Sequence, residues 1–250
     1  MAAIDTDAIR ANARHLATAG GGFPLVADVA ADGHGHGAVK TALAAIEGGA
    51  SWLSVSGVKD AEPLRAAGIR VPILASFCFG GDAAATGSLG VTIRDSTGET
   101  PQLFEPGTAL YGLGARASER GLVAAMRVSV PVLITKSIEP GGGVSYGYTF
   151  RAERKMNLAM VAIGYADGLD RRAGNVASMT LAHKPRNIVG RVAMNATVLD
   201  IGDDEVMPGE TAVLFGATGE PSAHSWANAV GATEDEVVTV FGRSLPRSYR

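Results

Sequence analysis

Apolar and polar positions in the first part of the chain follow helical and strand-like spacings in turn. Residues 5–17 carry apolar side chains at Ile9, Ala13 and Leu16 and a polar opposite face, which predicts a helix capped by Asp5 or Thr6. Compact apolar runs then predict strands at 25–30, 52–55 and 71–76, and helical spacing predicts helices at 38–45 and 59–67. Because helices separate the strands, we expect the strands to pair in parallel.

The pattern changes twice further along the chain. Residues 77–102 are rich in Gly, Ser and Thr and show no clear period except around 91–93, so we expect a poorly ordered connection there. From Met126 several β-rich runs are separated by turn residues, which predicts an antiparallel β domain with two short helices at 223–230 and 234–242. The predicted class is therefore α/β plus β, with one domain over residues 1–117 and the other over residues 118–250.

Composition narrows the classes of function. The 250 residues are 46% apolar and carry a net charge of −3 with no strongly basic stretch, which argues against a nucleic-acid partner. No apolar run reaches the roughly 18–20 residues of a membrane span, and the first residues carry charges where a signal peptide needs an apolar segment. The single cysteine, Cys78, fits a reducing compartment. These features predict a cytoplasmic protein without a membrane partner.

The stretch LVADVAADGHGHGAVKTAL places an apolar run, a glycine-spaced pair of histidines and a helix in succession. Asp32, His34 and His36 could together bind a metal, but clustered ligands of this kind are a weak signal, and no metal site is predicted. The glycines beside them could instead form a phosphate-binding nest, without the lysine and spacing of a P-loop. The pattern alone leaves the chemistry of this loop open.

Several motifs in this order resemble the alanine racemase family. The similar segments cover both predicted domains and are IDTDAIRANARHL, DGHGHGAV, EGGASWLSV, LRAAGIRVPILAS, EPGTALYGLG, VSYGYTF, IGYADGLDRR, IVGRVAMNATVLDIG, VLFG and LPRSY. The succession of IGYADG and GRVAM is the most specific. The resemblance implies an N-terminal (β/α)8 barrel that carries pyridoxal phosphate, a C-terminal β domain and a head-to-tail homodimer.

The barrel that the resemblance implies is too long for this chain. A (β/α)8 barrel needs about 200 residues at the least, whereas the barrel-like part ends near Ala117. About half of the barrel is therefore expected to be absent, with the gap between Ser76 and Glu105. The predicted architecture is a partial (β/α) barrel followed by an antiparallel β domain.

The resemblance also locates a cofactor site on the histidine loop. The family motif K-A-D/N-A-Y-G-H-G places its cofactor lysine on Ala30, its pocket tyrosine on His34 and its histidine on His36. The side chain of alanine has no amine, so it can neither attach the cofactor nor transfer a proton. Lys40 and Lys59 are better explained as solvated helix residues.

Other positions of the family's site are kept in part. Tyr146 matches the tyrosine base that the β domain offers across the dimer. Family contacts to the cofactor phosphate fall on Gly107, Thr108 and Tyr249. The family's arginine at the pyridine nitrogen falls on Glu105, for which a plain surface glutamate is the alternative interpretation.

Two substrate-pocket positions are kept as well, Tyr165 and Met194, while Asn195 replaces the family's aspartate. Taken with Ala30 and the missing barrel segments, these matches predict an alanine-racemase-like protein that is catalytically inactive and does not bind pyridoxal phosphate covalently. Two alternatives stay open. One is an active racemase that interconverts L- and D-alanine, and the other is an interaction protein that pairs with itself or with a complete racemase subunit.

Overall fold

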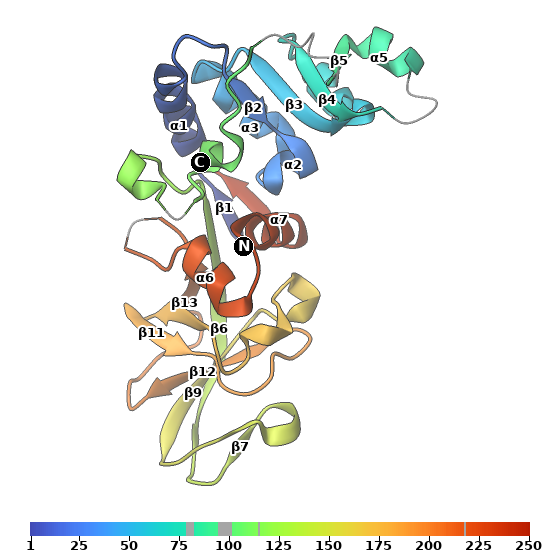
Figure 1. Ribbon diagram of the computed structural model, residues 1–250. Helices are drawn as coiled ribbons and strands as arrows, with labels where there is room; N and C mark the ends of the chain where they lie inside the picture. The colour runs from blue at the N-terminus through green and yellow to red at the C-terminus, as the bar shows by residue number, and fades with distance from the viewer. Residues whose placement is uncertain (79–82, 95–101, 115, 218) are drawn as a thin grey trace. The chain divides into compact units, whose positions relative to one another are not determined.

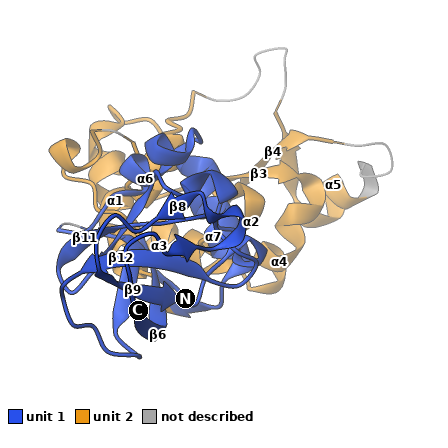
Figure 2. Cartoon of the chain, turned by 90° about the horizontal axis from the view of Figure 1, so that it is seen from below, with its two compact units in different colours: residues 1–3, 126–248 blue, residues 4–125, 249–250 orange. Residues whose placement is uncertain are grey.

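The computed structural model describes residues 1–250 except 79–82, 95–101, 115 and 218 (Figure 1). The chain divides into two compact units, coloured separately in Figure 2. Unit 1 contains residues 1–3 and 126–248, and unit 2 contains residues 4–125 and 249–250.

Unit 2 is built on a parallel sheet. Its four strands pair in chain order: β2 (Val26–Asp28), β3 (Trp52–Gly57), β4 (Ile73–Phe77) and β5 (Val91–Ile93). On the other edge of β2, Leu25 forms a parallel bridge with Phe104. The prediction of parallel βαβ units is confirmed, because a parallel pairing needs a long crossover, which here contains helices.

The helices of unit 2 follow the predicted apolar spacing. The first helix, α1 (Thr6–Ala19), buries Ile9, Ala13 and Leu16, and the carboxylate of Asp5 caps it by accepting the N–H of Ala8 at 2.9 Å. The remaining helical segments are α2 (Ala30–His34), α3 (Ala38–Glu47), η1 (Val58–Ala61), α4 (Glu62–Ala66), α5 (Ala83–Leu89), η2 (Gly107–Tyr111) and η3 (Ser118–Arg120).

Two predictions for unit 2 were wrong in detail. The strand expected over 25–30 ends at Asp28, because the backbone turns at Val29. The segment 77–102 is not irregular throughout, since within its described residues α5 forms and β5 pairs with β4 from Ile73↔Val91 onward. The remainder of that prediction falls on residues 79–82 and 95–101, outside the described residues.

Unit 1 is the predicted antiparallel β structure. The long strand β6 (Met126–Ile138) pairs with both β13 (Thr211–Phe215) and β9 (Met156–Val161). The other strands are β1 (Ala2–Ile4), β7 (Gly143–Val144), β8 (Phe150–Arg151), β10 (Ser178–Leu181), β11 (Lys184–Asn187), β12 (Thr197–Gly202) and β14 (Arg247–Tyr249). β1, with most of its residues in unit 1, and β14 extend the same sheet beside β6, in the order β11-β10-β13-β6-β1-β14.

Helical segments complete unit 1. The two predicted helices are present as α6 (Ala223–Val230) and α7 (Glu234–Ser244), and short 3-10 turns form at η4 (Tyr146–Tyr148), η5 (Tyr165–Asp167) and η6 (Arg171–Ala173). The rings of Phe215 and Phe241 pack 5.8 Å apart and join β13 to α7. Across the described part of the chain, no helix combines the length and the apolar character needed to cross a membrane.

Candidate functional site

The histidine loop begins with one turn of left-handed backbone. The φ angles of Ala31, Asp32, Gly33 and His34 are 50°, 58°, 63° and 48°. Such a conformation costs about 1–2 kcal/mol for each residue that carries a Cβ, so the surrounding contacts must compensate for it. At Gly33 a Cβ would also lie 2.9 Å from Oγ1 of Thr41, which leaves no room for a larger residue.

Hydrogen bonds within the loop hold this turn. The carboxylate of Asp32 accepts the N–H of Ala38 at 2.8 Å and so caps the start of α3. The backbone N–H groups that a phosphate nest would need donate instead to carbonyls of residues 29–33, and the donors are Gly33, Gly35, His36 and Gly37. The phosphate-nest alternative is therefore wrong, because these donors are already used.

The candidate metal ligands of the loop do not converge either. His36 is fully buried, and its Nδ1 donates to the carbonyls of Gly33 and His34 at 3.1 and 3.0 Å. Asp32 faces the start of α3 instead. Among the residues that the structure describes, no group of three or more His, Cys, Asp or Glu side chains is arranged to hold a metal.

His34 instead pairs with Asp28, the last residue of β2. Its Nε2 donates to the Asp28 carboxylate at 3.1 Å, and the other carboxylate oxygen accepts the N–H of Ala30 at 3.0 Å. Burial of Asp28 acts to raise its pKa, but the contacts with His34, Ala30 and Ser54 outweigh it, and the pKa lies below its usual value. Asp28 is thus a site residue that sequence reasoning missed, although its place two residues before Ala30 was a possible signal.

Tyr111 packs against both members of the His34–Asp28 pair. It is fully buried, its hydroxyl donates to the carbonyl of Asp28 at 2.6 Å, and its ring lies 5.2 Å from that of His34 and 4.4 Å from that of His36. Sequence reasoning assigned no role to Tyr111. The Tyr111 side chain, which belongs to η2, therefore contacts both the end of β2 and the histidine loop.

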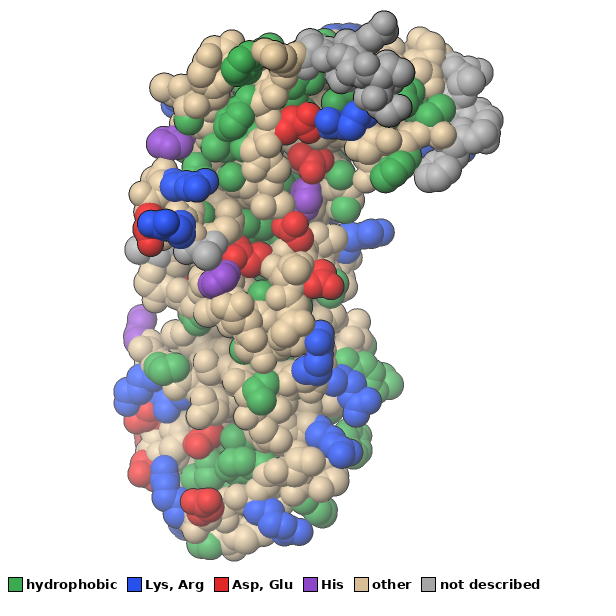
Figure 3. All heavy atoms as spheres, in the orientation of Figure 1, with side chains coloured by type: hydrophobic (Ala, Val, Ile, Leu, Met, Phe, Trp, Pro, Cys, Tyr) green, Lys and Arg blue, Asp and Glu red, His purple; other side chains and the backbone are tan. Residues whose placement is uncertain are grey.

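Glu105, on the family's arginine position, forms a bidentate ion pair with Arg94. Two guanidinium nitrogens of Arg94 donate to the two carboxylate oxygens at 2.9 and 2.6 Å, and both side chains are a little over one third exposed. The hydrogen bonds to Glu105 raise the pKa of Arg94, and the charge of Asp28 adds to this effect. Glu105 thus lies at the surface, as the alternative interpretation expected, but within a defined ion pair. Figure 3 shows acidic, basic and histidine side chains close together in the upper part of that view.

The positions matched to phosphate contacts lie at two places in unit 2. Gly107, with a φ of +57°, and Thr108 begin η2, next to Pro106. Tyr249 lies by α3, where the ammonium of Lys40 stands 5.9 Å from the centre of its ring. This cation–π contact gives Lys40 an aromatic partner in β14.

In unit 1 the segments that carry Tyr146 and Tyr165 both bond to the loop of residues 190–195, which carries Met194. Ser145, before Tyr146, donates its hydroxyl to the carbonyl of Arg191 at 2.6 Å. The N–H groups of Tyr165 and Ala166 donate to the carbonyls of Ala193 and Met194 at 3.0 and 2.9 Å. The side chains themselves are exposed, with exposed fractions of 72% for Tyr146, 42% for Tyr165 and 54% for Met194. Exposed large apolar side chains that form a continuous patch are typical of an interaction surface.

Comparison with known proteins assigns both parts of the chain to the same family. The model of the alanine racemase N-terminal domain matches residues 4–95, and the model of the alanine racemase C-terminal domain matches residues 125–249. The alanine racemase of Salinispora arenicola is 33% identical over 98% of this chain and 97% of its own length. That of Thermobifida fusca is 32% identical over 99% of this chain and 97% of its own length. The alignment with the first is 361 positions long and this chain has 250 residues, so at least 111 positions face a gap in it.

Solved structures agree with these relatives. Alanine racemase from Streptomyces lavendulae superposes with a TM-score of 0.87 at 27% identity, over 100% of this chain and 96% of that one. The enzyme from Streptomyces coelicolor A3(2) gives 0.90 at 26% identity, over 99% and 97%. The alanine racemase from Bartonella henselae, which has pyridoxal phosphate covalently bound, shares the fold at 22% identity with a TM-score of 0.81 over 100% and 99%.

Proposed function

The chain belongs to the alanine racemase family. Within that family, we propose that it is a member that does not racemise alanine. The observation that carries the proposal is the methyl side chain of Ala30, on the position of the family's cofactor lysine. Unit 2 contains two lysines, and neither offers a replacement: Lys40 contacts Tyr249, and Lys59 is exposed in η1. Without an amine at position 30, this chain has no group there to bind the cofactor covalently or to move a proton on that face.

The neighbouring side chains also fit the family's cofactor poorly. Glu105 stands where the family places an arginine, and Arg94 already occupies both of its carboxylate oxygens. His34 replaces the pocket tyrosine and donates to Asp28. The residues matched to phosphate contacts, Gly107 and Thr108, are present but supply no covalent anchor. The residues at these family positions therefore do not fit pyridoxal phosphate in the way that the family holds it.

We also propose that the chain has a shortened first domain and a second domain of β structure. A partial barrel over residues 1–117 and a β domain over residues 118–250 would account for the alignment gap, with the absent barrel segments falling between Ser76 and Glu105. The composition of the chain supports a cytoplasmic location.

Cofactor attachment tests the proposal directly. The purified chain would be incubated with pyridoxal phosphate, reduced with borohydride and examined by mass spectrometry, with an active alanine racemase treated in parallel. We expect the racemase to gain the mass of the reduced cofactor and this chain to stay unmodified. A modified lysine in this chain, or growth of a D-alanine auxotroph that carries it, would overturn the proposal.

The exposed side chains of unit 1 favour a second candidate, a role as an interaction protein. Tyr146, Tyr165 and Met194 are exposed on segments that bond to one another through the loop of residues 190–195, and we propose that they contact a second copy of the chain or a complete racemase subunit. Light scattering after size exclusion, with and without added racemase, tests this. A stable monomer that does not associate with the racemase would remove the candidate.

A further inference from the structure

The Arg94–Glu105 ion pair joins the two outer members of the parallel sheet. Arg94 directly follows β5, and its N–H donates to the carbonyl of Ala75 in β4. Glu105 directly follows Phe104, whose backbone exchanges hydrogen bonds with Pro24 and Val26 at the opposite edge. The two side chains therefore come from the first and the last position of the row Phe104-β2-β3-β4-β5.

A flat sheet could not bring these side chains together. Neighbouring strands lie about 4.8 Å apart, so the four steps from Phe104 to β5 would separate the backbones by about 19 Å. Fully extended arginine and glutamate side chains with a hydrogen bond between them span about 15 Å. Since the observed nitrogen–oxygen distances are 2.9 and 2.6 Å, the row must curl until its outer ends approach each other.

The electrostatic surroundings of Arg94 agree with this curvature. The negative charge of Asp28, at the end of β2, helps to raise the pKa of Arg94, which starts three strands away at the end of β5. Because its guanidinium also bonds to Glu105, which follows the residue paired with β2, Arg94 extends toward the β2 edge of the sheet. Both carboxylates that influence it, Asp28 and Glu105, lie at this end of the sheet.

We propose that the Arg94–Glu105 ion pair closes the curled sheet of unit 2 at its carboxyl end. The pair holds the outer members of this sheet together and covers the end at which ligands enter parallel sheets of this kind. This inference does not rest on the proposed loss of racemisation, because it concerns how unit 2 holds together.

A double-mutant cycle with a charge swap tests the proposal on the full chain. The variants are Arg94→Gln, Glu105→Gln, the two combined, and the swap Arg94→Glu with Glu105→Arg, and Arg116→Gln is the matched control. Arg116 forms an ion pair with Glu119 in the same unit, but both side chains are mostly exposed and the pair lies within one turn. The measured quantity is amide hydrogen exchange of peptides covering residues 91–94 and 102–106.

We expect each single glutamine variant to speed exchange in both peptides roughly fivefold, and the second substitution to add little. The swap should restore slow exchange only in part, because Asp28 then repels the carboxylate at position 94. The control should leave both peptides unchanged. Rates that multiply independently in the double variant, or a swap that exchanges as fast as the single variants, would overturn the proposal. If Arg94→Gln does not fold, a folded swap supports the closure, and an unfolded swap beside a folded Glu105→Gln contradicts it.

Discussion

Nε2 of His34 lies 3.1 Å from the carboxylate of Asp28, so the residue on the family's pocket-tyrosine position is held by the last residue of the preceding strand, β2. The same carboxylate accepts the N–H of Ala30, the residue on the family's lysine position. Asp28 therefore bonds to two of the family's site positions. His34 keeps a left-handed φ of 48° in this arrangement. The pair therefore compensates for part of the backbone strain of the loop, since a non-glycine residue is unfavourable there.

Replacing Asp28 by asparagine should destabilise the chain by about 1–3 kcal/mol near neutral pH, because two donors in a largely buried region lose a charged acceptor. The folded pKa of Asp28 lies below its ordinary value of 3.8. Its stabilisation is therefore present above the unfolded pKa and is lost as the pH falls through the lower folded pKa. Urea unfolding of the parent and the variant between about pH 6 and pH 2 should show the difference shrinking with acid. A difference that does not change with pH would show that the carboxylate charge is not what matters.

Replacing Ala30 by lysine should restore little cofactor attachment. An amine returns to the family's position, but two other family positions stay changed: Glu105 with its partner Arg94, and His34 with its partner Asp28. We expect less than about one tenth of the covalent labelling of an active racemase, measured by borohydride reduction and mass spectrometry. Ala30→Met is the control, because it has similar length without an amine. Labelling close to that of the racemase would mean that the lysine alone was missing.

The pairing of elements could be predicted from the sequence better than the contacts of the site. Apolar spacing located the strands and helices because burial determines both, as at Ile9 and Leu53. The motifs matched single positions to the family but could not show the partners of those residues. Arg94 and Glu105 are 11 residues apart, and Asp28 and Tyr111 are 83 residues apart. Neither spacing is a recognisable pattern, so only the folded sheet brings these partners together.

Replacing Asn12 by alanine should destabilise unit 2 by about 3 kcal/mol, because buried polar groups lose their partners. The Asn12 amide is buried in α1, donates to the carbonyls of Leu110 and Val123 at 3.0 and 2.8 Å, and accepts the N–H of Val123 at 2.9 Å. Chemical denaturation measures the change. Thr18→Ala, in the same helix but exposed, is the control and should stay within about 0.5 kcal/mol of the parent. Equal effects of the two substitutions would contradict this role of Asn12.

Replacing Tyr146 by alanine should weaken association without weakening the fold. The side chain is 72% exposed, so the free energy of unfolding should change by less than about 0.5 kcal/mol. Sedimentation at several protein concentrations would measure association. Tyr148→Ala is a neighbouring control, since that ring is 59% exposed but matches no predicted site position. Unchanged association in the Tyr146 variant would contradict its place at an interface.

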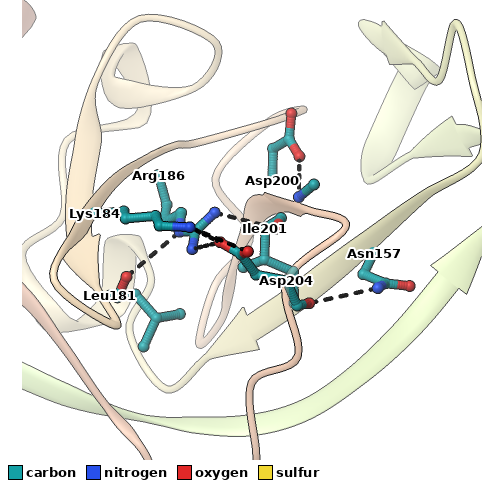
Figure 4. A network of polar contacts seen from close by, with 8 residues as sticks. Asn157, Leu181, Lys184, Arg186, Asp200, Ile201 and Asp204 are labelled. Atoms are coloured by element: carbon teal, nitrogen blue, oxygen red, sulfur yellow. Dashed lines mark hydrogen bonds and ion pairs between the residues drawn. The ribbon is translucent and has the colours of Figure 1, made fainter.

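Asp204 in unit 1 gives a pH-dependent prediction of its own. Its carboxylate accepts the ammonium of Lys184 at 2.8 Å and contacts the buried guanidinium of Arg186, which also donates to the carbonyls of Leu181 and Ile201 (Figure 4). These hydrogen bonds lower the pKa of Asp204 to about 2. The stabilisation is therefore present above the unfolded value of 3.8 and is lost as the pH falls through about 2.

Replacing Asp204 by asparagine should lower the urea midpoint of unit 1 near neutral pH, because Arg186 then keeps a buried charge without its carboxylate. The difference from the parent protein should narrow as the pH approaches about 2, where the parent carboxylate is protonated as well. Asp203→Asn is the matched control, because Asp203 pairs with Arg154 while 88% of its side chain is exposed. That control should leave the midpoint nearly unchanged. If both variants shift the midpoint equally, the contact with Arg186 is not what stabilises the hairpin of β10 and β11.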